Sequence, residues 1–414
     1  MFGGGTFGGF GQQQPQQQSV FGGAPAAAAG GIFGQPAGGG AFGQQGQAQG
    51  QFGQNAQNQQ VSFYDIPGVP DDTISSLAWA KQGFVLACGS WDNSVRVWEI
   101  QTSNMPPFYN AIQRCKYDHA APVLCVAWQD DSTALFSSSV DGEVKMYQIQ
   151  SQQAKTVGKH DRGARFVYWV QELNCIVSGG WDGRVRFWQG QPNPVADVQL
   201  PERIFAMDVK FPVMVAATAD HKVHIWNLQN LAQNSNPLRS IQMPNLKMQT
   251  RCLTLFPDKA GYAAGSVEGR CTIAWLEQQN PQRPGETRNF AFKCHRITPP
   301  GKQAGADDEI YPVSSIDFHP QMGTFATGGD DGTFVFWDKE NKQRLKVFDS
   351  IKVPITCVKF SPDGSTFACA TGYDWHKGHQ GNTGQVPTKI LLMKVDPENV
   401  KPKPKTAPTQ PGRR

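Results

Sequence analysis

An acidic residue recurs at tight-turn positions seven times along this chain, and five of the copies carry an aromatic residue six places later. Glu268 with Trp275 is a slipped copy, and Asp374 is a degenerate one. Successive acidic positions are 49, 41, 38, 48, 63 and 43 residues apart, close to the roughly 40 to 45 residues of one four-stranded propeller blade. This rhythm predicts an all-β, seven-bladed propeller. The five regular pairs are Asp92 and Trp98, Asp141 and Tyr147, Asp182 and Trp188, Asp220 and Trp226, and Asp331 and Trp337.

The copy at residues 174–188, NCIVSGGWDGRVRFW, shows the physical basis of the pattern. An apolar run, a Gly/Asp turn and an alternating run that ends in Trp188 predict two antiparallel strands joined by a tight turn. The unit resembles a WD repeat. That resemblance implies a hydrogen-bonded structural tetrad of His160, Ser178, Asp182 and Trp188, whose polar character is structural and not catalytic.

A ring of blades has to be closed, because an open sheet edge invites pairing with other chains. Residues 60–66, QVSFYDI, can supply the outer strand of the last blade, whose own strands end near residues 389–395, KILLMKV. The sequence therefore predicts a propeller domain over residues 61–400 that is closed by its N-terminal strand.

Composition and spacing argue against several classes of protein. No apolar run approaches the roughly 20 residues of a membrane span, and we expect no secretory signal. Nine cysteines without a CxxC pair predict reduced core thiols in a cytosolic or nuclear protein. The tetrad accounts for Ser, His and Asp at the turns, and His376 and His379 lack a set of further ligands. We expect no enzyme, no cofactor, no metal and no membrane partner.

The two ends of the chain differ in composition from the repeats. Residues 1–60 contain 18 Gly, 16 Gln, no charged residue and seven Phe-Gly dipeptides, which predicts a disordered extension. This leader is either a flexible tail without a special role, or a string of weak contacts resembling those of FG nucleoporins, directed to the pore meshwork or to transport receptors. Residues 401–414 carry five positive charges and predict a flexible basic tail. That tail is either simply solvated, or makes weak contacts with RNA phosphates or import factors.

Four segments carry a more specific resemblance: LPER at 200–203, GSVEGR at 265–270, FAFKCHR at 290–296 (opening the insertion before blade six) and YDWHKGH at 373–379. Together they resemble the Rae/Gle family of nuclear-pore mRNA export factors, over essentially all of the propeller. A mitotic-checkpoint WD protein of the Bub type shares the EGR and FKCHR elements. The YDWHKGH segment and the Phe-Gly leader favour the export factor, although the leader is longer and richer in Gln than is usual for that family.

The resemblance implies a non-enzymatic binding platform that supports mRNA export. Its expected partner is an FG nucleoporin whose GLEBS segment, a hairpin-like peptide, lies across the top face of the ring, so that a monomeric propeller becomes half of a heterodimer. Further partners would be export receptors, and RNA through the basic tail. The expected location is the nucleus, at the pore complex of the nuclear envelope, with shuttling to the cytoplasm. The rival interpretation is a checkpoint adaptor that binds a similar segment of a mitotic kinase.

Three residues beside the turns are the main candidates for partner binding. Trp91 and Trp181 stand directly before the turn acids of their repeats, where a small residue would suffice, and large aromatic side chains are common interface anchors. Arg270 would present its guanidinium to acidic residues of the GLEBS segment. The alternatives are that each indole only caps its own blade, and that Arg270 pairs locally with Glu268.

Five further residues complete the candidate set. Lys293, His295 and Arg296 could extend a basic patch, with a tetrad role for His295 as the alternative. Tyr373 and Trp375 belong to the last blade near the same rim, with packing inside a long loop as the alternative for Trp375.

Overall fold

The computed structural model describes residues 62–191, 193–277, 279–280, 283–298 and 308–404. The predicted Phe-Gly extension and residues 405–414 of the predicted basic tail lie outside the described residues.

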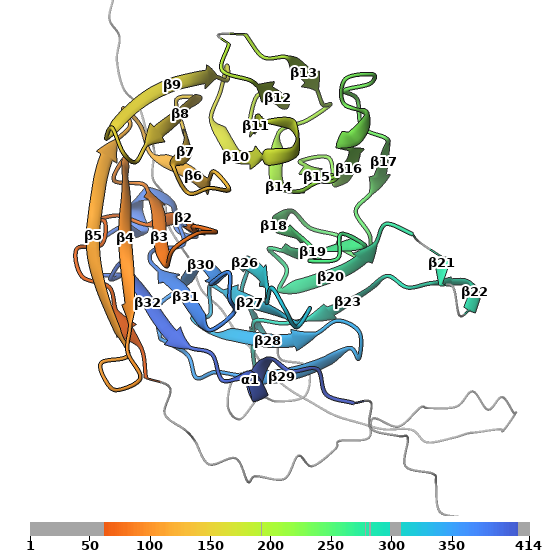
Figure 1. Cartoon of the computed structure of the whole chain (residues 1–414). Helices are drawn as coiled ribbons and strands as arrows, with labels where there is room; N and C mark the ends of the chain where they lie inside the picture. The colour runs from red at the N-terminus through yellow and green to blue at the C-terminus, as the bar shows by residue number, and fades with distance from the viewer. Residues whose placement is uncertain (1–61, 192, 278, 281–282, 299–307, 405–414) are drawn as a thin grey trace, which may run out of the picture. The chain divides into compact units, whose positions relative to one another are not determined.

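Seven four-stranded antiparallel sheets form the propeller, and β2, β6, β10, β14, β18, β26 and β30 are the strands that face its centre (Figure 1). Neighbouring innermost strands contact one another all the way round, including β30 with β2. The fold is therefore the predicted seven-bladed β-propeller. Blades one to three consist of β2 (Ile74–Trp79), β3 (Val85–Ser90), β4 (Ser94–Thr102) and β5 (Tyr109–Asp118); β6 (Val123–Trp128), β7 (Ala134–Ser139), β8 (Glu143–Gln148) and β9 (Gln153–Lys159); and β10 (Ala164–Val170), β11 (Cys175–Gly180), β12 (Arg184–Trp188) and β13 (Ala196–Gln199).

The remaining blades follow the same plan, with two differences. An additional hairpin precedes the outer strand of blade five, and the outer strand of blade seven comes from the N-terminal side of the chain. Blades four to seven consist of β14 (Ile204–Lys210), β15 (Val213–Thr218), β16 (Lys222–Asn227) and β17 (Arg239–Gln242); β18 (Thr250–Leu255), β19 (Gly261–Ser266), β20 (Arg270–Trp275) and β23 (Phe290–Lys293); β26 (Val313–Phe318), β27 (Phe325–Gly329), β28 (Phe334–Asp338) and β29 (Gln343–Val347); and β30 (Ile355–Phe360), β31 (Thr366–Thr371), β32 (Lys389–Lys394) and β1 (Tyr64–Asp65).

Several short elements are present in addition to the strands of the blades. The FAFK segment, predicted to open an insertion before blade six, instead forms the outer strand of blade five and pairs with β20. The extra elements are the pairs β21 (Gln279–Asn280) with β22 (Arg283–Thr287) and β24 (Arg296–Ile297) with β25 (Glu309–Ile310), the 3₁₀ helices Gln171–Leu173, Leu228–Asn230 and Gly378–Gly381, and α1 (Pro397–Val400).

The N-terminal strand closes the ring as predicted. β1 pairs antiparallel with β32, and the backbone N–H of Ile66 donates to the carbonyl of Ile390 at 2.9 Å. The ladder ends at Pro67, which has no N–H to donate. Closure therefore depends on a strand from one end of the domain completing a blade built by the other end.

The hydrophobic core consists of seven clusters, each shared by two neighbouring blades. Between blades six and seven, Phe334, Phe336, Phe360 and Phe367 pack with ring centroids 4.9 to 5.9 Å apart. Burying each such side chain contributes roughly 1.5 to 3 kcal/mol. The nine cysteines are free thiols, and seven of them are buried.

The second strand of each blade is almost completely buried, because neighbouring blades cover both of its faces. Small residues dominate these strands. At Gly265 a Cβ atom would lie 2.7 Å from the side chain of Val313 in the next blade, which leaves no room for a larger residue.

Candidate functional site

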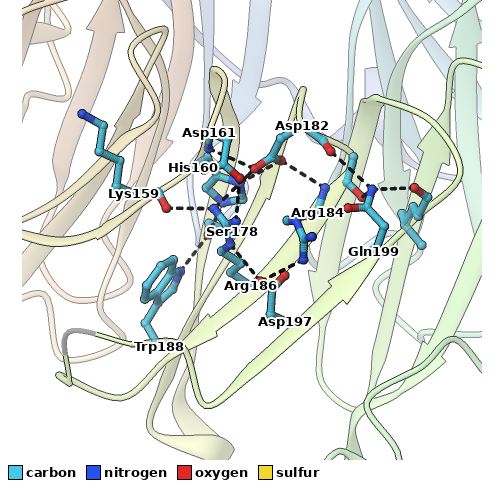
Figure 2. Close-up of polar contacts among 12 residues, drawn as sticks. Lys159, His160, Asp161, Ser178, Asp182, Arg184, Arg186, Trp188, Asp197 and Gln199 are labelled. Atoms are coloured by element: carbon cyan, nitrogen blue, oxygen red, sulfur yellow. Dashed lines mark hydrogen bonds and ion pairs between the residues drawn. The ribbon is translucent and has the colours of Figure 1, made fainter.

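Hydrogen bonds join the four tetrad side chains of blade three (Figure 2). Asp182 binds Nδ1 of His160 at 3.0 Å, and Nε2 of the same ring lies 2.7 Å from Oγ of Ser178. The indole Nε1–H of Trp188 donates to the same Ser178 oxygen at 2.8 Å. Burial alone would raise the pKa of Asp182, but hydrogen bonds from His160 and from the backbone N–H groups of Arg184 and Asp161 hold it below its ordinary value. The tetrad thereby fixes the turn at one end of the blade.

Arg186 extends this network to the outer strand of the blade. Its guanidinium lies 3.3 Å from Asp182, 3.1 Å from Asp161 and 3.3 Å from Asp197 of β13, and it donates to the Lys159 carbonyl at 2.8 Å (Figure 2). The guanidinium thereby connects the turn and the outer strand of blade three to the end of β9 in blade two. These polar groups are structural, as the WD-like pattern indicates.

The partner-binding role proposed for His295 from the sequence does not fit the structure. Its side chain is buried, with Nδ1 2.9 Å from Asp331 and Nε2 2.9 Å from Oγ1 of Thr327. Trp337 donates to the same threonine oxygen at 2.9 Å. His295 is thus the histidine of a second tetrad, in blade six, and cannot reach a partner.

The structure of blade five shows why Trp275 follows Glu268 by seven residues instead of six. Trp275 pairs with Gly261 across the strands, and Ala274 occupies the position that Trp188 holds in blade three. The Glu268 carboxylate instead accepts from the backbone N–H groups of Lys247 and Met248, at 3.0 and 3.4 Å. This blade therefore uses an acid at the turn without a tetrad.

A cavity of about 780 Å³, here called the channel-mouth cavity, lies on the axis of the ring. Residues from the innermost strand of every blade line it. Its wall also includes the residue before the turn acid in four blades. These four are Trp91, Trp181, Val267 and Tyr373.

Three indoles at this cavity are half-buried and reach it from separate blades. Trp91 packs against Trp375 with ring centroids 5.5 Å apart. Trp181 lies over Gly163, where a Cβ atom would be 2.6 Å from the indole ring. Trp375 has a left-handed backbone, with φ of 61°, and its buried Nε1–H has no hydrogen-bond partner among the described residues. The structure therefore brings the predicted Trp91, Trp181 and Trp375 to one cavity.

Tyr373 contributes to the wall of the cavity but is itself buried. Its hydroxyl donates to the carbonyl of Gly378 at 2.9 Å and accepts from the backbone N–H of Lys377 at 3.0 Å. Its carbonyl accepts from Thr73 of the first blade at 3.1 Å. Tyr373 thus holds the loop that carries Trp375, and its hydroxyl is already occupied by that loop.

The sequence reasoning missed a second ring of residues in this cavity. In each blade the innermost strand has a β-bulge at its second residue, and a bulge re-aims the side chain that it carries. Charged residues inside otherwise apolar strands, as in ARFVYWV and TRCLTL, were the available signal. This bulge ring consists of Ser75, Leu124, Arg165, Phe205, Arg251, Ser314 and Thr356, all of which line the cavity.

The remaining predicted residues form a separate group, here called the blade-five corner: Arg270, Lys293 and Arg296. Arg270 and the exposed Lys293 are cross-strand partners in β20 and β23. Arg270 lies 3.5 Å from Glu268 and keeps about a third of its side chain exposed. Arg296 donates to the carbonyl of Glu268 at 2.7 Å, so its guanidinium is partly engaged by the turn. Both arginines therefore have local partners. The contact of Arg270 with the Glu268 carboxylate, at 3.5 Å, is the longer of the two.

The described part of the chain offers little for other kinds of site. Within it, no three His, Cys, Asp or Glu side chains gather as a metal would require. His376 is bound to Asp374 and not to His379. No described helix has the length and apolar character needed to cross a membrane.

Comparison with known proteins agrees with the propeller fold. The family described as WD domain, G-beta repeat, matches residues 64–99, 112–148, 151–189, 306–338 and 342–376. The chain is 40% identical over 347 residues to the Poly(A)+ RNA export protein of Schizosaccharomyces pombe, covering 82% of this chain and 93% of the relative. The chain belongs to the Rae/Gle family of mRNA export factors.

Two further members of the family show the same extent of similarity. Protein RAE1 of Arabidopsis thaliana is 39% identical, with 84% of this chain and 94% of the relative covered. The mRNA export factor GLE2 of Chaetomium thermophilum is 37% identical, with 82% and 92% covered. The family consists of non-enzymatic export factors, in agreement with the expectation that this chain is not an enzyme.

A solved structure shares the fold alone. The chain titled Structure of U3-55K superimposes with a TM-score of 0.64 at 16% identity, covering 80% of this chain and 98% of that one. At this identity the similarity concerns only the propeller architecture.

Proposed function

We propose that this protein is a non-enzymatic mRNA export factor that docks on the nuclear pore by binding the GLEBS segment of an FG nucleoporin. The docking face would be the one that carries the channel-mouth cavity and the blade-five corner. The protein would then be a monomeric propeller within a heterodimer, located in the nucleus at the pore complex and shuttling to the cytoplasm. Similarity to relatives named as mRNA or poly(A)+ RNA export factors supports this proposal.

The observation that supports this proposal most directly is that Trp91, Trp181 and Trp375 line one cavity. Half-buried aromatic side chains that converge from different blades offer contact area at little entropic cost, as interface anchors do. A peptide crossing the axis of the ring would cover all three.

The blade-five corner supplies a charge partner. About a third of the Arg270 side chain is exposed and its contact with Glu268 is long, at 3.5 Å, so an acidic residue of a peptide can share or replace that pairing. Removing one member of a desolvated pair costs on the order of 2 to 5 kcal/mol, partly because the other charge is left unpaired.

Titration calorimetry with the full chain and a synthetic nucleoporin GLEBS peptide tests the proposal. We expect W91A to weaken binding by about 2 kcal/mol and R270E by about 2 to 5 kcal/mol. R114E is the matched control, because Arg114 is exposed on the outer strand of blade one and paired with Glu99. Unchanged affinity in both W91A and R270E contradicts the docking face.

The same titration addresses the rival function. Tighter binding to a GLEBS-like peptide of a checkpoint kinase than to the nucleoporin peptide would favour a checkpoint adaptor. The contribution of the Phe-Gly leader to docking is tested by deleting residues 1–60 in the same assay. That of the basic tail is tested by deleting residues 401–414 in titrations with RNA or an export receptor.

A further inference from the structure

The channel-mouth cavity has a strongly basic wall on blades three to five. The bulge ring directs Arg165 and Arg251 into the cavity, and Arg162 and Arg203 line it from the loops before β10 and β14. A cluster of four guanidiniums around one cavity is costly unless negative charge lies nearby.

Little negative charge in the protein meets these arginines. Among the ion pairs of the described residues, none involves Arg162, Arg165 or Arg203. Among the described residues, the Arg165 side chain donates to the carbonyl of Leu124, at 2.7 Å, and its guanidinium lies 4.7 Å from the ring centre of Phe166. Burial lowers the pKa of Arg165, and the positive charge of Arg251 acts in the same direction.

Asp374 of blade seven is the one acidic residue among the described residues that line the cavity. Asp161, Asp182 and Glu202 line a neighbouring pocket that shares Arg162, Trp181 and Arg203 with it. Asp330 is 3.7 Å from Arg251 and accepts a hydrogen bond from Ser314. Asp374 is bound to His376. An anion in the cavity would therefore lie against Arg162, Arg165 and Arg203, away from Asp330 and Asp374.

We propose that the channel-mouth cavity is a phosphate-binding site. Guanidiniums bind phosphate oxygens in a bidentate manner, and a compact ligand with several phosphate charges can engage more than one of them at once. The volume of about 780 Å³ falls in the range of small-molecule sites, roughly 300 to 1,000 Å³. The phosphates belong either to a free polyphosphate or to an RNA strand, whose bases would find the indoles of Trp91 and Trp181 beside the arginines.

This inference goes beyond the proposed docking of a nucleoporin peptide and is tested without that peptide. The full chain is titrated at about 50 mM salt with inositol hexakisphosphate, a uridine decamer and a glutamate decamer, each monitored by calorimetry. The variants are R162Q/R203Q, which changes two exposed side chains without ion pairs, and R165Q, which removes the half-buried guanidinium. R114Q is the control on the outer surface of blade one.

We expect at least one phosphate probe to bind, with affinity reduced about tenfold or more in R162Q/R203Q and in R165Q but not in R114Q. Thermal unfolding checks that R165Q is folded, and R162Q/R203Q decides the outcome if it is not. Arginine-dependent binding of the hexakisphosphate alone identifies a free polyphosphate site, and of the decamer alone an RNA site.

Three results overturn the proposal. They are failure of both phosphate probes to bind, equal affinity in the variants and in R114Q, and binding of the glutamate decamer as tightly as the phosphates. The last result would assign the arginines to a protein carboxylate. None of them bears on whether W91A or R270E weakens the nucleoporin peptide, so the two proposals fail separately.

Discussion

Individual side chains at the blade turns are kept in one protonation state by their surroundings. Asp331, like Asp182, is buried, which raises its pKa, yet hydrogen bonds from His295 and Thr333 bring the pKa below its ordinary value. His119 in blade two shows the opposite case, because it bonds to Ser137 and Ser139 instead of a carboxylate. Burial, assisted by Lys145, lowers the pKa of His119 to about 4.

This difference predicts a pH-dependent stability. In the unfolded chain His119 titrates near 6.5, whereas in the folded chain it stays neutral down to about pH 4. Its contribution is therefore fully present above pH 6.5 and is lost as pH falls from 6.5 towards 4. Between pH 6.5 and pH 5 the loss amounts to about 2 kcal/mol. We expect H119Q to lose less stability over this range in denaturant unfolding.

The matched control is H379Q, because His379 is exposed. A slope of stability against pH that is the same in H119Q, H379Q and the unchanged chain would contradict the assignment.

Within single elements, the position in the blade decides what a residue does. The middle strands accept only small residues where the next blade packs against them, and the bulge of each innermost strand turns one side chain into the cavity. Alternation of apolar and polar residues predicts strands, but it does not reveal a bulge that shifts the register by one residue.

Substitution of a middle-strand glycine tests this packing. In G265A the new Cβ would lie 2.7 Å from Val313 and 2.8 Å from the sulfur of Cys252. We expect a loss of about 1 to 3 kcal/mol in the free energy of unfolding, because adjoining strands must shift. G372A is the control, since its Cβ would meet nothing closer than 3.4 Å. Equal free energies of unfolding in the two variants would show that the interface between the blades accommodates the added methyl group without loss of stability.

In the whole molecule, stability depends on closure of the ring. Every blade shares its core with two neighbours, so opening one interface exposes apolar surface on both sides. Strand β1 covers the outer edge of β32 and places Ile66 in the cluster between blades one and seven.

Truncation measures the value of that closure. A chain that begins at residue 67 lacks β1 and Ile66, whereas a chain that begins at residue 61 keeps both. We expect the shorter chain to have the lower thermal midpoint, because β32 becomes an exposed edge and a buried side chain is lost. Identical midpoints would mean that the seventh blade is stable with three strands.

The sequence alone determined the number of blades, the tetrad partners of blade three and the strand that closes the ring. The number of blades follows from local turn chemistry repeated at a regular spacing, and the tetrad from the resemblance of each unit to a WD repeat. The closing strand follows from the need to cover the open edge of the last blade. The tertiary structure decided which of the candidates meet. Trp91, Trp181 and Trp375 come from distant repeats and share a cavity, whereas His295 proved to be a core tetrad residue. The arginine wall was not predicted, because its members converge only when bulges in separate blades turn their side chains to the common axis.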